Sequence, residues 1–361
     1  MKFRLSLNWL LVLVPVSIIL DRMGSVSPPV VFVAAAVAIV PAAALIVRST
    51  EQIALRSGDA IGGLLNATFG NAPELIISTV ALRAGLLDMV RAAIIGAILA
   101  NLLLGVGVAF LLGGLRYKDQ EYNPNASRIY STMMLLAVVS LLVPSAFGVR
   151  FAAAEYASET RALNTWLAWL LLGIYGLYLA FMLRTHPHLF KSRAGDGEHE
   201  ETATWSLPRA LAGLLGASVL AAWMSEILVG AVEGTGEALG MSEVFIGIIV
   251  VAAVGGAAEI LSAISAGRKN KVDLTMGIAY GSSVQIALFV APVLVLLSRF
   301  IAPEPLYLSF ARPELWALFL TVLIGAMVSG DGRSNWFKGI QLIAVYVIIA
   351  LLFYFVPELP S

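Results

Sequence analysis

The chain has 361 residues, of which 59% are hydrophobic and only 13% are charged, a composition typical of integral membrane proteins rather than of soluble domains. Its 23 basic and 23 acidic residues give a formal net charge of zero, which excludes a basic surface for nucleic acid. The absence of cysteine excludes disulfides, thiolate metal sites and cysteine chemistry.

The apolar stretches predict an all-α membrane protein. At roughly 20 residues per crossing, a chain of this length allows about eleven transmembrane helices joined by short loops. Lys2 and Arg4 precede the first apolar run, but no small-residue cleavage site follows, so we predict a retained first helix. The predicted spans are 5–20, 28–47, 61–82, 90–114, 129–148, 163–183, 207–230, 244–266, 274–300, 313–329 and 336–356.

Two glutamates lie inside predicted spans, 185 positions apart. Glu74 ends the sequence Gly-Asn-Ala-Pro-Glu, and Glu259 ends the sequence Gly-Gly-Ala-Ala-Glu. An ionisable side chain at the centre of a membrane helix costs about 2.5–3.5 kcal/mol on insertion scales, so it usually faces a cavity and has a function. We therefore predict that the two glutamates hold one cation near the middle of the membrane.

The chain also aligns with itself at this spacing. Arg83 matches Arg268, and Asp88 matches Asp273. The repeat is about five helices long, and because five is odd, the second copy is expected to be inverted in the membrane, as in many secondary transporters. The predicted parts are an N-terminal helix, a first five-helix repeat, a cytoplasmic acidic linker and a second five-helix repeat, at residues 1–24, 25–184, 185–206 and 207–361.

The linker at 185–206 is the one clearly hydrophilic segment, and it contains the acidic run 196–201. It lacks the spaced ligands of a calcium-binding EF-hand loop, so we interpret it as solvated. All three histidines lie in it, outside the predicted membrane. Most lysines and arginines fall on the side of the N-terminus and of this linker, which predicts a cytoplasmic N-terminus and an external C-terminus. We expect a prokaryotic plasma membrane.

Further oxygen ligands are predicted beside the first glutamate. Asn71, Glu74 and Ser78 would share one helix face. Pro73 has no N–H and clashes with the carbonyl four residues earlier, so the carbonyl of Phe69 is expected to be free for an ion. For Ser78 the alternative is helix packing.

The second half offers a similar set. Gly255 and Gly256 can loosen the helix of Glu259, and Ser262 and Ser265 continue its polar stripe, either as ligands or as packing residues. Neutral oxygens would come from Asn101, Ser282, Ser283 and Gln285. Carboxylate, amide, hydroxyl and carbonyl oxygens without nitrogen or sulfur suit Ca²⁺. Glu51 and Glu233, near span ends, are either interfacial or line an entry path for the ion.

Residues 62–76 (GGLLNATFGNAPELI) and 281–289 (GSSVQIALF) resemble the calcium/cation antiporter superfamily, and most closely its calcium/proton exchanger (CAX) family. The resemblance covers about residues 45–330. It implies eleven helices, central glutamates at Glu74 and Glu259, and uptake of H⁺ in exchange for Ca²⁺ from the cytosol. Gly255-Gly256 departs from the usual Gly-Asn pair of the family. Pro73 replaces a small aliphatic residue and is similar to the sodium/calcium exchanger motif.

The leading hypothesis is a secondary antiporter in which Ca²⁺ and H⁺ compete for Glu74 and Glu259, and the site opens to one side at a time. A sodium/calcium exchanger of the same superfamily is the first alternative, and a cation channel is the second. An enzyme is not expected, because no histidine lies in a predicted span and Asp331 has no second aspartate beside it in a membrane core. We expect no cofactor, only Ca²⁺ as transported ligand, and no partner besides the lipid bilayer.

Overall fold

The computed structural model describes residues 7–57, 62, 64–65, 68–146, 157–190 and 203–355. The fold is almost entirely helical, as predicted, with one pair of short strands. The chain divides into two compact units, the first formed by residues 1–93, 200–258 and 356–361 and the second by residues 94–199 and 259–355. Each unit therefore contains segments of both predicted repeats. Most of the predicted acidic linker, residues 191–202, lies outside the described residues.

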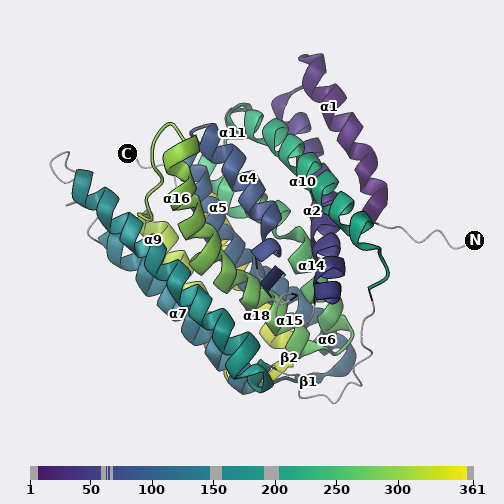
Figure 1. The fold of residues 1–361 in the computed structure, drawn as a ribbon, viewed down its shortest axis with the longest axis vertical. Helices are drawn as coiled ribbons and strands as arrows, with labels where there is room; N and C mark the ends of the chain where they lie inside the picture. The colour runs from purple at the N-terminus through teal and green to yellow at the C-terminus, as the bar shows by residue number, and fades with distance from the viewer. Residues whose placement is uncertain are drawn as a thin grey trace, which may run out of the picture. The chain divides into compact units, whose positions relative to one another are not determined.

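The first unit is built of helices around the long helix α2. Its elements are η1 (Leu7–Val12), α1 (Leu13–Met23), α2 (Pro28–Ser57), α4 (Ala72–Arg83), the first half of α5 (Leu87–Leu99), α10 (Leu207–Gly230), α11 (Val232–Leu239), α12 (Glu243–Phe245), the π-helical segment η6 (Ile246–Val251), α13 (Ala252–Gly255) and the first residues of α14 (Ala257–Arg268). Helix α10 lies along α2 (Figure 1), and α1, α11 and α13 also contact α2. Ala42, Ala217 and Ala221 are fully buried in this contact, and such small residues let membrane helices approach closely.

The segment before α10 is attached to the C-terminal part of α2. Gln52 Oε1 accepts hydrogen bonds from the backbone N–H of Thr204 (2.8 Å) and of Trp205 (2.9 Å). The guanidinium groups of Arg48 and Arg209 lie 5.0 and 4.9 Å from the centre of the Trp205 ring, which is a cation–π arrangement. The end of the predicted linker is thus fixed to the first unit.

The second unit contains the remaining helices and the strand pair. Its elements are the second half of α5, the π-helical segment η2 (Ala100–Gly105), α6 (Val106–Tyr117), β1 (Asp119–Glu121), α7 (Pro124–Ala146), α9 (Ala157–Ala180), η4 (Phe181–Thr185), η5 (Pro187–Phe190), most of α14, α15 (Val272–Gln285), the π-helical segment η7 (Ile286–Val290), α16 (Ala291–Ile301), α17 (Arg312–Ser329), β2 (Arg333–Asn335) and α18 (Trp336–Phe355).

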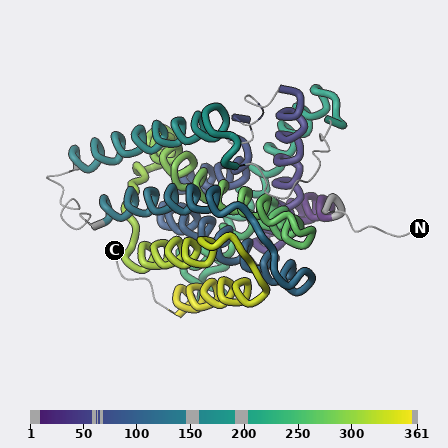
Figure 2. The backbone as a smooth tube through the Cα atoms, turned by 90° about the horizontal axis from the view of Figure 1, so that it is seen from below, coloured from purple at the N-terminus to yellow at the C-terminus, as the bar shows by residue number. Residues whose placement is uncertain are grey.

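Close helix contacts in the second unit depend on glycine. Helix α18 packs on α6, α17 on α7, and α16 on α9. At the first of these contacts, a Cβ atom on Gly339 would clash with the backbone nitrogen of Leu111, so no larger residue fits there. Figure 2 shows α17 and α18 as neighbouring yellow-green and yellow segments joined by a turn.

Eight helices in the described parts of the chain are long and apolar enough to cross a membrane, and a ninth crossing results if the bent pair Val232–Leu239 and Glu243–Gly255 is one span. The predicted number of eleven is therefore not confirmed. Predicted spans 61–82 and 244–266 are not single helices, because each is broken just before its glutamate. The span predicted at 5–20 is a 3-10 segment followed by the short helix α1.

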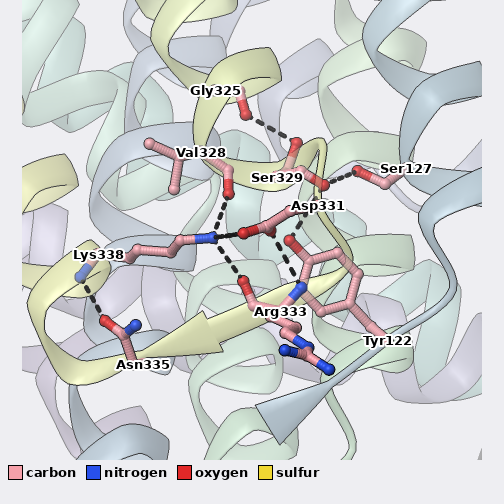
Figure 3. Close-up of polar contacts among 9 residues, drawn as sticks. All are labelled: Tyr122, Ser127, Gly325, Val328, Ser329, Asp331, Arg333, Asn335 and Lys338. Atoms are coloured by element: carbon pink, nitrogen blue, oxygen red, sulfur yellow. Dashed lines mark hydrogen bonds and ion pairs between the residues drawn. The ribbon is translucent and has the colours of Figure 1, made fainter. Parts of the chain in front are cut away.

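The strand pair and the end of α17 form a polar cluster in the second unit (Figure 3). Strands β1 and β2 are antiparallel, with Gln120 opposite Ser334. The carbonyl of Ser329 accepts hydrogen bonds from the hydroxyls of Tyr122 (3.1 Å) and Ser127 (3.0 Å). Burial raises the pKa of the Tyr122 hydroxyl, so it remains a donor. The last carbonyls of a helix have no partner within the helix, and these side chains supply one.

Lys338 connects the turn after α17 to α18 (Figure 3). Its Nζ atom donates to the carbonyl oxygens of Val328 (3.0 Å) and Arg333 (2.8 Å) and forms an ion pair with Asp331 (2.7 Å). Partial burial by itself raises the pKa of the Asp331 carboxyl, but the hydrogen bonds and the charge of Lys338 and the hydrogen bond from the Arg333 N–H outweigh it, so the pKa is lowered. Asp331 thus has a structural partner.

We expect Lys338→Met to destabilise the protein by about 0.5–1.5 kcal/mol, because the part-buried carbonyl of Val328 and the exposed carbonyl of Arg333 lose a charged donor. Asp331→Asn should lower the free energy of unfolding by about 0–1 kcal/mol, since this carboxylate is largely exposed. Because the pKa of Asp331 is lowered in the folded protein, its carboxylate stabilises the fold above about pH 4, the pKa of an unfolded aspartate. This stabilisation is lost as the pH falls through the pKa of Asp331 in the folded state. The difference in stability between wild type and Asp331→Asn should therefore vanish in strong acid. Thermal unfolding in detergent from neutral pH into strong acid measures both effects.

The matched control is Arg333→Gln, because the Arg333–Glu121 ion pair (3.4 Å) is exposed on both sides and should contribute almost nothing. Equal melting temperatures for Lys338→Met and Arg333→Gln would contradict the role assigned to Lys338.

Candidate cation site

Glu74 lies in the first turn of helix α4 in the first unit. The helix begins at Ala72, with Asn71 at its N-cap position and Pro73 among its first two residues. Pro73 therefore starts a helix, where its missing N–H would have no partner in any case. This differs from the expectation that Pro73 interrupts a continuous helix and thereby frees the carbonyl of Phe69. The chain breaks instead at a turn formed by Gly70 and Asn71, and Phe69 as a ligand stays a prediction.

Glu74 is buried together with two polar neighbours of its own helix. Its side chain is 7% exposed, and the predicted neighbours Asn71 and Ser78 are also buried. Within the described residues, neither carboxylate oxygen of Glu74 has a hydrogen-bond partner. Burying a charged group without such partners is strongly unfavourable, although the N-terminal end of a helix attracts negative charge. A bound proton or a bound cation would remove the cost.

Gly255 brings a second backbone segment against Glu74. A Cβ atom at position 255 would lie 3.1 Å from Cγ and 3.7 Å from Cα of Glu74. Because position 255 has no side chain, α13 can approach the glutamate at van der Waals distance. Gly256 then ends α13, with φ −79° and ψ 8°.

Glu259 occupies the corresponding place in helix α14. Both α4 and α14 have 12 residues, and their bounds, Ala72–Arg83 and Ala257–Arg268, differ by 185 positions at each end. Glu259 is 8% exposed and lies in the first turn, as Glu74 does. Helices α5 and α15 also begin 185 positions apart. The repeat found in the sequence thus recurs in the helix bounds, whereas its inverted orientation stays a prediction.

Four of the predicted neutral ligands lie in the second unit together with Glu259. The side-chain N–H of Asn101 donates to the hydroxyl of Ser282 (3.1 Å), and both residues are buried. The hydroxyl of Ser283 donates to the carbonyl of Ala279 in its own helix (2.8 Å). Gln285 is half-buried at the end of α15. The structure therefore brings Asn101 and Ser282 into direct contact.

The remaining predicted residues are more exposed. Ser262 and Ser265 are exposed on α14, so they do not belong to a packed interface of this unit. Glu51 is exposed on α2, and Glu233 is exposed in the first turn of α11. Their role in an entry path stays a prediction. No three Asp, Glu, His or Cys side chains among the described residues form a group that could hold a metal ion.

Four π-helical segments among the described residues, η2, η4, η6 and η7, were not predicted from the sequence, and two of them lie at matching places in the repeats. Segment η2 contains Asn101, and η7 begins directly after Gln285, so both follow the same point of the two repeats. π-helical turns in α-helices are frequent at functional sites. The signal in the sequence that could have indicated these two segments is a single amide residue, Asn101 or Gln285, in an otherwise apolar run.

Comparison with known proteins agrees with this architecture. Residues 27–184 and 209–355 match the family described as sodium/calcium exchanger protein. The chain is 43% identical to the Ca(2+)/H(+) antiporter ChaA of Bacillus subtilis over 94% of this chain and 96% of the relative. It is 41% identical to a Ca(2+)/H(+) antiporter of Aphanothece halophytica over 92% and 91%.

Solved structures give the same result. The structure of native YfkE matches with a TM-score of 0.83 and 38% identity, over 97% of this chain and all of that chain. The structure of the H⁺/Ca²⁺ exchanger CAX matches with a TM-score of 0.70 over 96% of this chain and 91% of that chain, and at 15% identity it supports the fold alone. The resemblance inferred from the sequence is confirmed: the chain belongs to the sodium/calcium exchanger protein family, within its calcium/proton exchanger branch.

Proposed function

We propose that this protein is a secondary antiporter that moves Ca²⁺ out of the cytosol in exchange for H⁺. The relatives named above are Ca²⁺/H⁺ antiporters, which are transporters and not enzymes. The observation that carries the proposal is the buried carboxylate of Glu74, which has no hydrogen-bond partner within the described residues. A group in that position is stabilised by whichever of the two ions it binds.

Two glutamates make the exchange possible. Glu74 and Glu259 supply two negative charges, which one Ca²⁺ or two protons neutralise. An ion bound to both carboxylates must therefore leave before protons take its place, and this competition couples the two fluxes. We assign both glutamates to one site because they occupy equivalent places in the repeat. Each lies in the first turn of its helix, and the two helices begin 185 positions apart.

Neutral oxygens complete the proposed coordination. Ca²⁺ takes about 6–8 oxygen ligands, more than two carboxylates provide. Asn71 is buried three residues before Glu74, and the buried pair of Asn101 and Ser282 lies in the unit of Glu259. The further candidate ligands are Ser283, Gln285 and the carbonyl of Phe69.

The broken helices support alternating access. Both glutamate helices start at a turn, and discontinuous helices with their N-terminal ends at the ion site are a recurrent feature of transporters built from repeats. In the proposed cycle the site opens to one side at a time. Glu51 and Glu233, which are exposed, would lie along the paths that lead to it.

The first test replaces the charge and keeps the shape. Glu74→Gln and Glu259→Gln should each reduce exchange to the background level, because an amide neither neutralises Ca²⁺ nor carries a proton. The measurement is ⁴⁵Ca²⁺ uptake into proteoliposomes with an imposed pH gradient, after size-exclusion chromatography has shown that the variants are folded. Glu226→Gln, at an exposed position of α10, is the matched control and should retain uptake. Wild-type uptake by either folded site variant would refute the proposal.

The second test identifies the driving ion. The match to sodium/calcium exchanger structures has a TM-score of 0.52 at 16% identity, which supports the fold and does not favour sodium. We expect ⁴⁵Ca²⁺ flux to follow an imposed pH gradient. Ca²⁺ uptake into the proteoliposomes should be accompanied by proton efflux, which raises the pH of their lumen, and Ca²⁺ efflux should lower it. A Na⁺ gradient of equal size should have no effect. Flux that follows Na⁺ and ignores pH would show a sodium/calcium exchanger, and flux without proton movement would show a channel.

The third test concerns the contact between Gly255 and Glu74. Gly255→Ala places a methyl group 3.1 Å from Cγ of Glu74, closer than an ordinary contact, so the carboxylate must shift. We expect about a tenfold higher KM for Ca²⁺, which corresponds to roughly 1.4 kcal/mol. Gly216→Ala is the control, because a Cβ atom there meets nothing within 4 Å and Ala favours the helix. Equal KM values for the two variants would contradict a ligand role for Glu74.

A further inference from the structure

Two arginines line one depression on the surface of the second unit. The depression has a volume of about 410 Å³ and is lined by Leu112, Leu115, Arg116 and Arg268. Three of these residues come from the last turns of α6, and the fourth is the last residue of α14. It belongs to neither the proposed ion site nor an entry path.

The depression results from a close crossing of α6 and α14. A Cβ atom on Gly267 would lie 2.9 Å from the carbonyl oxygen of Ala109, and one on Gly113 would lie 2.7 Å from the carbonyl oxygen of Gly267. Beyond the crossing, Gln120 donates to the carbonyl of Gly267 (3.1 Å) and to the side chain of Asn270 (2.8 Å). The backbones at this end of the two helices are therefore fixed, and Arg116 and Arg268 project from fixed positions.

The charges of both arginines are available to a ligand. Within the described residues, neither Arg116 nor Arg268 forms an ion pair with a carboxylate. Arg116 stacks on the ring of Tyr117, with its guanidinium carbon 5.2 Å from the ring centre, and this contact leaves its donors unused. Arginines at helix C-termini also interact favourably with the helix dipole, but that effect does not place two of them on one depression.

The rest of the lining is apolar. Leu112 is 37% exposed and Leu115 is 65% exposed, and both lie within the membrane-spanning segment Leu87–Tyr117. A ligand that fits this surface has an anionic group for the two guanidiniums and a hydrocarbon part for the leucines. Planar guanidinium groups match phosphate oxygens well, and basic pockets between transmembrane helices bind anionic lipid head groups.

We propose that this depression binds an anionic phospholipid, with the phosphate between Arg116 and Arg268 and an acyl chain along Leu112 and Leu115. The arginines stand at the ends of their helices, where a head group would lie. The distribution of lysine and arginine predicts that this end is cytoplasmic, so the lipid would come from the cytoplasmic leaflet. The proposal does not depend on which ion drives transport.

A fluorescence quenching experiment on the full-length protein tests the proposal. Ser265 is exposed on α14, three residues before Arg268, and the chain has no native cysteine, so Ser265→Cys accepts a single bimane label. The labelled protein in neutral detergent is titrated with brominated phosphatidylglycerol or with brominated phosphatidylcholine of the same acyl chains. We expect phosphatidylglycerol to quench at a clearly lower concentration.

Three further variants in the labelled background locate the effect. Arg116→Gln with Arg268→Gln should weaken quenching by phosphatidylglycerol about 10- to 30-fold and leave quenching by phosphatidylcholine unchanged, since each basic residue near a membrane contributes roughly one factor of five. Arg116→Lys with Arg268→Lys keeps the charge, so this variant should weaken quenching by phosphatidylglycerol less than the glutamine variant does. Lys269→Gln with Lys271→Gln removes the same charge from the adjacent exposed loop and should change quenching less than about threefold.

Several outcomes would overturn the proposal. They are equal quenching of the wild type by both lipids, an unchanged response of the Arg116→Gln, Arg268→Gln variant, and an equal loss in the Lys269→Gln, Lys271→Gln control. Inorganic phosphate at about 10 mM should not displace the lipid, because it cannot use the leucines. Full displacement by phosphate would show a phosphate site in place of a lipid site.

Discussion

The burial of a carboxylate within apolar helices is the constraint on which the site depends. Glu74 is enclosed by α4 and α13 and has no hydrogen-bond donor among the described side chains. The glutamate lies in the first turn of a helix, where the helix dipole favours negative charge. The neighbouring segment presents a glycine, which allows its backbone to approach closely. Neither feature neutralises the charge, which is the reason we propose a mobile ion as the neutralising partner.

The same problem of unmatched polar groups recurs at the helix ends and is solved there with fixed partners. The last carbonyls of α17 receive hydrogen bonds from Tyr122, Ser127 and Lys338, and Lys338 also neutralises Asp331. A structural end is thus saturated by the protein's own donors. Within the described residues, the carboxylate of Glu74 has no such partner, and we interpret this contrast as the difference between a supporting polar cluster and the proposed ion site.

The candidate site can be predicted from the sequence because its signals are local, and its function stays a proposal. A glutamate in an apolar run, a second one 185 positions later, and matched charges at Arg83 and Arg268 require no knowledge of packing. The all-α fold follows from composition for the same reason. The family motifs at 62–76 and 281–289 then identify the branch, and the comparisons agree.

Other features depend on geometry that the sequence does not encode locally. Pro73 is compatible both with the interior of a kinked helix and with its first turn, and only the turn at Gly70 and Asn71 decides between them. The π-helical segments differ from α-helix by one hydrogen-bond register, and the strand pair has three residues on each side. The depression at Arg116 and Arg268 arises from a crossing of helices more than 140 positions apart in the chain.

The contact at Gly255 also bears on how this sequence can change over generations. Among the 32 glycines, Gly216 and Gly230 face open space and could drift to alanine with a gain in helix propensity. At Gly255, a methyl group would lie 3.1 Å from Cγ of Glu74, so the glutamate side chain would have to shift. In the proposed ion site, a substitution at this position would act on the carboxylate of Glu74 directly, so natural variation there would change ion binding while leaving the other helix contacts in place.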